Sequence, residues 1–429
     1  MLYHFLSTAN RLLWNGPLLV LLLGVHVYFT IRLRGVQRKL PFAVRLSAGP
    51  EKKNLFASLA TALAATLGTG NIVGVSTAIA LGGPGAVFWC WLTGLFGMST
   101  AYAESYISVA CRRADSSGKL RGGIMYVFSD TLGLKKLGTL FAFLLLTASF
   151  GVGCSTQAGT VSETLHTLTG LVPAVSGILL VFFVGYVILH GSTSITRFCS
   201  VLVPVMAVLY LFFCLLLLGI NHTCVFPAIR QIVVSAFTPS AALGGITGGS
   251  FLTSARYGIA RGLFTNEAGL GTAPLAFVEE EKSNPEKAAL LSMSAVFFDT
   301  VVLCALTGIV IVSSLLRFPS LAENVSSTEL TGAAFSLLPG GKIFLGISLI
   351  AFAYATLIGW SYFGAQAVIY LFGESSLQTY RLCYLGMIFI GCILSLPLIW
   401  ELTDFINACM VIPNITALLL LRKSIRPPK

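Results

Sequence analysis

The sequence predicts an all-α polytopic membrane helix bundle of about 11 transmembrane helices: an inverted repeat of 5+5 helices with two broken helices, preceded by one extra helix. Three observations predict this class. Of the 429 residues, 56% are hydrophobic and 10% are charged, whereas soluble domains have about 25% charged residues. Apolar runs long enough to cross a hydrocarbon core of about 30 Å recur along the chain. Two of these runs are interrupted by glycine at corresponding places in two halves, a pattern typical of transporters built from inverted repeats.

The predicted spans divide into an extra helix and two repeats within a single membrane domain. The extra helix covers 12–31, the first repeat 55–220 and the second repeat 228–421. The spans are expected at 12–31, 55–81, 86–111, 137–168, 172–189, 198–220, within 232–278, and at 288–316, 343–372, 380–400 and 405–421. The region 232–278 is too long for one span and dense in glycine, Gly244 and Gly249 included, so an interfacial helix followed by a broken helix is expected there. A short helix is expected in the linker 318–340.

Basic residues predict the orientation of the chain. Lys and Arg concentrate in the connections 32–53 and 112–136 and in the segment 422–429. Because cytoplasmic loops carry such an excess, the N-terminus is expected outside and the C-terminus in the cytoplasm, in a multi-pass protein of the inner or plasma membrane. The net charge of +11 is then a feature of topology, and membrane lipid rather than nucleic acid is the expected surrounding.

Scattered cysteines and histidines predict no enzyme site. The ten cysteines form no C-x-x-C pair, and the five histidines lie mostly at span ends without a ligand partner at suitable spacing. A membrane-embedded enzyme would need a nucleophile with a base, or a metal cluster. We therefore expect no catalytic residue, no organic cofactor and no metal other than a transported cation.

The first break is the segment Gly68-Thr69-Gly70-Asn71-Ile72-Val73-Gly74. Glycine weakens a helix, and Thr and Asn offer the backbone competing hydrogen bonds. At such a break, N–H groups can hold a substrate carboxylate while freed carbonyls coordinate a cation. The alternative is that Gly70 and Gly74, as G-x-x-x-G, only allow two helices to approach closely.

The second break runs from Arg261 to Pro274 and contains two charges, Arg261 and Glu267, in an apolar context. Charges within the membrane are functional candidates. The alternative is a structural or gating ion pair near the cytoplasmic end. Three further charges at span depth or near span ends, Glu104, Glu163 and Asp299, are expected to serve structural pairing rather than ion coupling.

Four segments in order resemble the alanine or glycine:cation symporter family, which is described as sodium:amino-acid symporters. They are GGPGAVFWCW at 82–91, the first break, NEAGLG at 266–271 and GWSY at 359–362. The likeness covers nearly the whole chain. It implies the five-plus-five inverted-repeat fold of the sodium-coupled neurotransmitter transporter relatives, with one extra helix in front.

The resemblance also implies roles for residues. Substrate would be bound by Thr69, Gly70, Asn71, Gln157, Phe264, Thr356 and Trp360, with Trp360 limiting the pocket to small amino acids. The cation, Na+, would be bound at Gly68, Asn71 and Thr356. Plainer interpretations stay open: Gln157 as a bond between helices, Trp360 as a packed aromatic residue, and Thr356 as a hydroxyl bonded to its own helix.

The chain departs from the family pattern near the inner end of the ninth span. Ala365 and Gln366 stand where the family commonly has a Glu-Lys pair, and Cys90 stands where Met is usual. The missing charge pair leaves gating and cation choice open.

The predicted function is sodium-coupled symport of small neutral amino acids, alanine, glycine or D-alanine, into the cell by alternating access. The alternatives are proton-coupled symport of another small amino acid and a passive channel, which would need a continuous polar stripe through the bundle. The sequence does not distinguish between the candidate amino acids, and it does not predict the ion stoichiometry or the oligomeric state.

Overall fold

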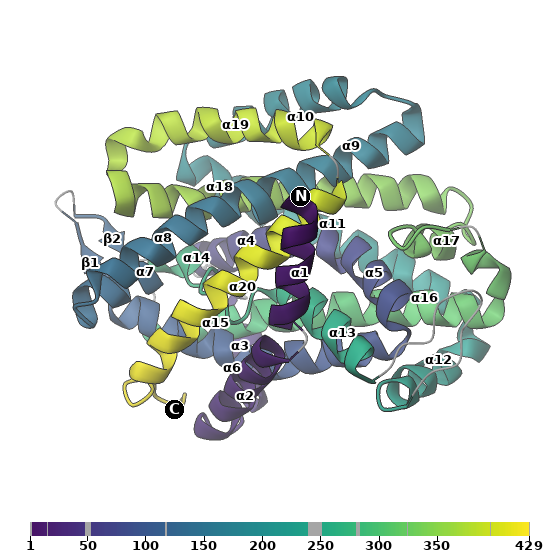
Figure 1. Cartoon of the computed structure of the whole chain (residues 1–429), viewed down its shortest axis with the longest axis horizontal. Coiled ribbons are helices and arrows are strands. Elements are labelled where there is room, and N and C mark those ends of the chain that lie inside the picture. The colour runs from purple at the N-terminus through teal and green to yellow at the C-terminus, as the bar shows by residue number, and fades with distance from the viewer. Residues whose placement is uncertain are drawn as a thin grey trace.

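A computed structural model describes residues 2–14, 16–47, 53–115, 118–238, 251–279, 284–323, 325–394 and 396–428, and nearly all of their regular structure is helical (Figure 1). The strands of these residues are β1 (Arg113–Ala114) and β2 (Leu120–Arg121), which pair as a short antiparallel hairpin. The predicted all-α membrane bundle is confirmed. The hairpin and the C-terminus lie toward the same end of the long axis, whereas α12 and α17 lie toward the other end (Figure 1).

The first half of the chain contains the extra helix and the first broken helix. Its helices are α1 (Leu2–Trp14), α2 (Pro17–Arg32), η1 (Val36–Lys39), α3 (Leu40–Ser47), α4 (Lys53–Thr66), η3 (Thr69–Asn71), α5 (Val73–Gly82), α6 (Gly85–Ala110), α7 (Ile124–Tyr126), η4 (Val127–Thr131), α8 (Lys135–Phe150), η5 (Gly151–Ser155), α9 (Thr156–Thr169), α10 (Pro173–Ile188) and α11 (Ser192–Ile220).

The second half contains the second broken helix and the C-terminal spans. Its helices are α12 (His222–Ser235), α13 (Phe251–Asn266), α14 (Leu275–Val278), α15 (Pro285–Val296), η6 (Phe297–Cys304), α16 (Ala305–Arg317), η7 (Pro319–Ala322), α17 (Leu330–Phe335), α18 (Gly341–Phe372), η8 (Glu374–Ser376), α19 (Leu377–Ile393) and α20 (Leu396–Leu420). The short helix predicted in the linker 318–340 is thus present. Gly244 and Gly249 lie outside the described residues.

Six helices of the described part are long and apolar enough to cross a membrane, or seven if the bent pair α1–α2 counts as one span. Three of the six are composite: α8, η5 and α9 form one helix, Lys135–Thr169, α15, η6 and α16 form another, Pro285–Arg317, and η8 with α19 forms the third, Glu374–Ile393. The halves of the broken helices are shorter because glycine and polar residues interrupt them. With α2, α6 and α10, they complete the predicted set of spans.

Three predicted boundaries were wrong, each because of a local signal. The first span is divided between α1 and α2, whose axes differ by 43°, and Pro17 begins the second of these helices. The tenth span ends at Ile393 rather than Trp400, and Trp400 belongs to α20. The helix ahead of the second break, α12, begins at His222 and therefore precedes the expected region.

The two broken helices pack against each other in opposite directions. Helix α13 contacts α5 and helix α14 contacts α4, so the first half of each broken helix lies beside the second half of the other. Helix α18 packs on α4, α8, α9 and α11, and α6 packs on α13 and α15. The two breaks consequently face each other in the interior, between α18 and η6.

Candidate functional site

The first break begins where α4 ends at Thr66. Gly68 is extended (φ −115°, ψ −156°), one short turn η3 follows, and α5 starts at Val73. A methyl group on Gly68 would lie 2.7 Å from Thr356 Oγ1 and 3.1 Å from Gln157 Oε1, so only glycine allows α9 and α18 to approach this closely. The Thr69 N–H donates a hydrogen bond to Gln157 Oε1 at 3.2 Å. The break therefore presents a backbone donor to a buried polar side chain.

The two breaks meet at Gly70. A methyl group there would lie 2.7 Å from Thr265 Cγ2 and 2.8 Å from Phe264 Cδ1, both in α13. At Gly74 the nearest atom would be Arg261 Cδ at an ordinary 3.8 Å. Close approach thus explains Gly70 and not Gly74. The segment that approaches Gly70 is the second break. At Gly70, close helix packing and formation of a binding site therefore require the same contact.

A buried carboxylate lies beside the first break. Asn71 Nδ2 donates to Asp299 Oδ1 at 2.7 Å, and Thr300 Oγ1 donates to Asp299 Oδ2 at 2.6 Å. The Thr265 and Thr300 hydroxyls are 3.2 Å apart. None of the ion pairs among the described residues includes Asp299, although its side chain is fully buried.

Two buried oxygens in this cluster have no hydrogen-bond partner within the described chain: Asn71 Oδ1 and Thr69 Oγ1. Buried polar atoms are almost always satisfied, which makes these two oxygens candidate ligand atoms. From the sequence, Asp299 is expected to serve structural pairing, and the structure gives it the Asn71 amide as a partner. The one sequence signal for a role of Asp299 is its acidic side chain in an apolar span. The sequence does not identify Asn71 as its partner.

The π-helical segment η6 positions Asp299. It interrupts the regular helix between α15 and α16 and carries Asp299, Thr300 and Cys304. Such segments occur often at functional sites because the extra residue per turn redirects side chains. A second π-helical segment, η5, ends at Ser155, two residues before Gln157. Gln157 accepts the hydrogen bond from Thr69 N–H of the first break, and η6 contacts η3 of the same break.

The second break is held by an internal carboxylate. Glu104 Oε1 of α6 accepts hydrogen bonds from Gly269 N at 2.9 Å, from Gly271 N at 3.1 Å and from Asn414 Nδ2 at 2.5 Å. The backbone there has positive φ at Glu267 (55°), Gly269 (103°) and Gly271 (76°). A positive φ at a residue other than glycine costs about 1 to 3 kcal/mol and requires support from the surroundings. Because Glu104 occupies these N–H groups, the second break is not free to hold a substrate carboxylate through them.

Trp360 connects α18 to the second break. Its Nε1 donates to Glu267 Oε1 at 3.0 Å, and its ring packs directly on Gly153 of η5. Glu267 Oε2 accepts from Thr272 Oγ1 at 2.5 Å. Trp360 is fully buried. Trp360 is thus a packed aromatic residue that also donates a hydrogen bond to Glu267 of the second break.

The contacts of Thr356 partly support the interpretation that its hydroxyl is bonded to its own helix. Its Oγ1 lies 3.1 Å from Phe352 O of its own helix and 3.0 Å from Ala64 O of α4. A hydroxyl has one hydrogen and donates to one of these carbonyls at a time. The hydroxyl also lies beside Gly68, where a methyl group would come within 2.7 Å of it. Gln157 likewise bonds between helices, and its acceptor is directed at the break.

Arg261 and Glu267 do not pair with each other, so the alternative of a mutual ion pair was wrong. Arg261 Nη2 lies 3.0 Å from Asp404 Oδ2, and its guanidinium lies 4.7 Å from the centre of the Trp400 ring. Phe264 also contacts Trp400, with ring centres 4.8 Å apart. Arg261 lies in α13, on the opposite side of the break from α14. A partner about 140 residues away was beyond the reach of local sequence patterns.

All the predicted site residues are buried. Thr69 and Asn71 are fully inaccessible, and Gln157, Phe264 and Thr356 are at most 5% exposed. The structure brings six of them together around the first break: Gly68, Thr69, Gln157 and Thr356 on one side, and Gly70 with Phe264 on the other. A charged ligand here would be shielded from bulk water on both sides.

Comparisons with known proteins cover nearly the whole chain. The sequence profile of the sodium:alanine symporter family matches residues 1–427. The chain is 41% identical to the sodium/alanine symporter AgcS of Methanococcus maripaludis over 97% of this chain and 94% of that protein. It is 35% identical to the probable sodium/glutamine symporter GlnT of Bacillus subtilis over 98% and 89%. The structure of MhsT in complex with L-phenylalanine shares the fold, with a TM-score of 0.60 and 16% identity over 85% of this chain and 88% of MhsT.

Proposed function

The chain belongs to the sodium:alanine symporter family, and on that premise we propose that it carries alanine or glycine into the cell together with Na+. It is a multi-pass secondary active transporter and not an enzyme. The single observation that carries the substrate and ion assignment is the meeting of the two breaks beside a buried carboxylate, at Gly70 and Asp299. The mechanism is alternating access, in which the cation assembles the two breaks and thereby links ion binding to substrate binding.

The substrate carboxylate is assigned to the first break. The Thr69 N–H already donates to an oxygen, Gln157 Oε1, at 3.2 Å. In this proposal Gln157 occupies the position of the carboxylate and moves aside when substrate arrives. The second break is excluded as the carboxylate site because its N–H groups are taken by Glu104.

The cation is assigned to the cluster around Asn71. Asn71 Oδ1 and Thr69 Oγ1 are unpaired, and Asp299 supplies a negative charge. Hard cations such as Na+ take oxygen ligands of this kind, and one carboxylate balances one unit charge. Gly68 and Thr356, which the resemblance also implied, lie on the other side of the break and would complete a second set of oxygens.

Proton coupling is the competing hypothesis, and Asp299 is the reason to keep it. A buried carboxylate without a basic partner can be neutralised by a proton as well as by a metal cation. The two hypotheses differ in the ion whose gradient drives uptake.

The substrate is assigned to the small amino acids on steric grounds. Trp360 packs on Gly153 and is held by Glu267, so the ring cannot move easily to make room for a larger side chain. Phe264, held by Trp400, closes the pocket from the α13 side. Arg261 with Asp404 then acts as a gate on that side, and Glu267 as a support for Trp360.

Reconstitution in liposomes tests the proposal. Labelled alanine should accumulate against its own gradient when Na+ is higher outside, and a membrane potential or proton gradient alone should not replace Na+. Uptake that ignores the Na+ gradient but follows a proton gradient would favour the competing hypothesis. Equilibration without accumulation would identify a passive channel.

Replacing Asn71 tests the site. Asn71→Leu removes the donor to Asp299 and an unpaired oxygen, so uptake should be lost while insertion and yield stay normal. Full activity in this variant would remove the assignment of both ligands to the first break.

A further inference from the structure

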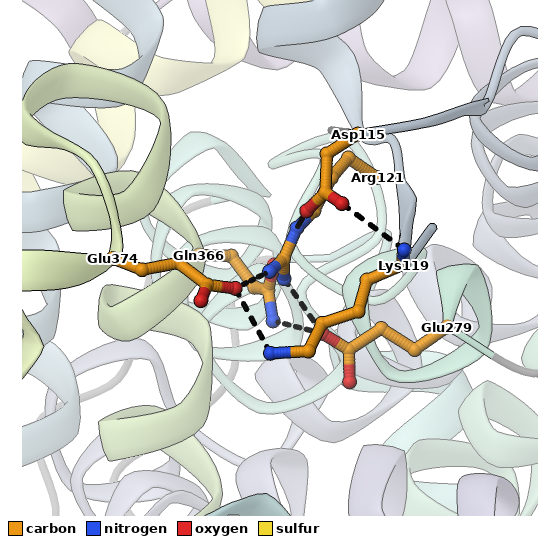
Figure 2. Close-up of polar contacts among 6 residues, drawn as sticks. All are labelled: Asp115, Lys119, Arg121, Glu279, Gln366 and Glu374. Carbon is orange, nitrogen blue, oxygen red and sulfur yellow. Dashed lines mark hydrogen bonds and ion pairs between the residues drawn. The ribbon is translucent and has the colours of Figure 1, made fainter. Parts of the chain in front are cut away.

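A polar cluster at the hairpin end of the molecule joins segments far apart in the chain (Figure 2). At its centre is Arg121 of β2, whose side chain is only 3% exposed. Arg121 Nε lies 2.9 Å from Asp115 Oδ2 and Nη1 lies 3.0 Å from Glu279 Oε1, while Nη2 contacts Glu374. Lys119 also binds Glu374, at 3.0 Å. One guanidinium therefore holds three carboxylates from three different segments.

Glu279 connects this cluster to the second broken helix. It directly follows α14, the short second half of that helix. Gln366 of α18 donates to the same Glu279 oxygen at 2.9 Å. At the level of the site, Trp360 of α18 donates to Glu267 of the same broken helix. The second broken helix is thus attached to α18 at two levels, and Arg121 adds the hairpin to the outer of these.

The cluster lines a cavity of about 450 Å³. Its walls include Arg121, Glu279, Ser361, Tyr362 and Gln366. Ser361 directly follows Trp360, so the cavity extends inward as far as the turn of α18 that borders the binding site. Its volume lies within the range of about 300 to 1,000 Å³ that is usual for sites of small molecules. An amino acid released past Trp360 would enter this space.

Arg121 keeps its positive charge in this cluster. Burial lowers the pKa of its guanidinium, but the hydrogen bond that Arg121 donates to Asp115 and the negative charges of Glu279, Asp115 and Glu374 outweigh burial, and the pKa is raised above its ordinary value. Glu279 is 33% exposed but Arg121 is buried, so loss of its partners would leave a buried charge without compensation. To open the hairpin end of the molecule, Arg121 and Glu279 must therefore separate, and water must replace the contacts that they lose.

Building on the proposed function, we propose that the 450 Å³ cavity is the release vestibule for the amino acid and that Arg121, Glu279 and Gln366 form its gate. Separation of Glu279 from Arg121 and Gln366 frees α14, and α14 carries the second break away from α18. The gate residues determine how readily the chain opens toward the hairpin end, which the basic loops predict to be cytoplasmic.

Gln366 sets the strength of this gate in the present chain. It donates to Glu279 as a neutral amide, so the bond lacks the charge that a lysine would bring. Gln366→Lys should strengthen the gate, whereas Arg121→Gln and Glu279→Gln should weaken it. The two kinds of variant should change hydrogen exchange at 275–279 in opposite directions. A general loss of structure would also reduce alanine binding, which opening or closing of a gate leaves unchanged.

The matched control is Arg113→Gln. Arg113 lies in β1 of the same hairpin and forms an ion pair with Asp130 at 3.0 Å, but its side chain is 59% exposed, and it makes no ion pair with the segments of the cluster among the described residues. It removes the same charge from the same hairpin without touching Glu279.

The experiment uses the full chain in liposomes, and three measurements are made on each variant. These are binding of labelled alanine in Na+, Na+-driven uptake, and hydrogen exchange of the peptides covering 118–126 and 275–279. For Arg121→Gln and Glu279→Gln we expect unchanged binding, uptake lowered about tenfold and faster exchange in both peptides, a change within the usual range of coupling between sites. Gln366→Lys should slow exchange at 275–279 and lower the turnover rate. Arg113→Gln should match the wild type.

The possible outcomes distinguish failure of the gate proposal from failure of the proposed transport function. If the wild type neither binds nor accumulates alanine, the proposed function fails. If it does both but Arg121→Gln and Arg113→Gln give the same uptake and exchange, the gate alone is overturned. Should Arg121→Gln fail to fold, Glu279→Gln and Gln366→Lys decide instead, and equal exchange at 275–279 in these two variants would overturn the gate.

Discussion

The side-chain amide of Asn71 donates a hydrogen bond to Asp299 Oδ1 at 2.7 Å and joins the first break to η6 across 228 residues of chain. This contact connects a polar residue in a broken helix with a buried carboxylate that has no basic partner among the ion pairs of the described residues. The amide uses its donor on Asp299 and leaves its oxygen unpaired. A cation beside this pair would satisfy both the oxygen and the negative charge.

Asp299→Asn should weaken cation binding. The substitution keeps the shape and removes the negative charge, so the Na+ concentration for half-maximal uptake should rise by about tenfold or more, which corresponds to about 1.4 kcal/mol. Uptake of labelled alanine at varied Na+ measures it. Asp130→Asn, which breaks only the ion pair with Arg113, is the control. An unchanged Na+ dependence in Asp299→Asn would place the cation elsewhere.

Gly70→Ala and Gly74→Ala should differ, although both glycines belong to one G-x-x-x-G pattern. A methyl group at position 70 would lie within 2.8 Å of Thr265 and Phe264, whereas at position 74 it would meet only Arg261 at 3.8 Å. Overpacking of this kind costs about 1 to 3 kcal/mol and would separate the two breaks. We expect alanine uptake to be lost in Gly70→Ala and kept in Gly74→Ala. Equal effects would mean that the pattern serves helix packing alone.

Glu104→Ala should destabilise the second break. It leaves the N–H groups of Gly269 and Gly271 buried without an acceptor, at a cost of roughly 1 to 3 kcal/mol for each group. Glu104→Gln keeps an acceptor oxygen and should stay close to the wild type. Thermal unfolding in detergent, together with Na+-dependent alanine binding, distinguishes the two variants. Glu323→Ala, at an exposed position between α16 and α17, is the control. Similar unfolding temperatures for Glu104→Ala and Glu323→Ala would contradict the role of Glu104.

Trp360→Phe should relax the selection for small substrates. The smaller ring opens space beside Gly153 and loses the hydrogen bond to Glu267. A competition series of unlabelled amino acids against labelled alanine should show stronger inhibition by larger neutral amino acids than in the wild type. Trp91→Phe, outside the site, is the control. An unchanged order of inhibitors would show that Trp360 does not limit the pocket.

Hydropathy and glycine patterns predicted much of the fold because they are local. Apolar length marks a span wherever it lies in the chain, and glycine with Thr or Asn weakens a helix through its own backbone. The breaks at Gly68–Gly74 and after Asn266 were therefore found from sequence and are confirmed. Boundaries such as Ile393 and Trp400 were missed because an apolar run does not reveal where one helix ends and the next begins.

The sequence by itself determined that this chain is a membrane bundle with two broken helices, and it identified the polar residues at each break. Only the tertiary structure decided which partners those residues have. Asp299 lies with Asn71, Arg261 lies with Asp404 instead of Glu267, and Glu104 occupies the backbone of the second break. The physical reason is that a buried polar group must find its partner in space, and these partners are brought together by packing of helices that are more than a hundred residues apart in the chain.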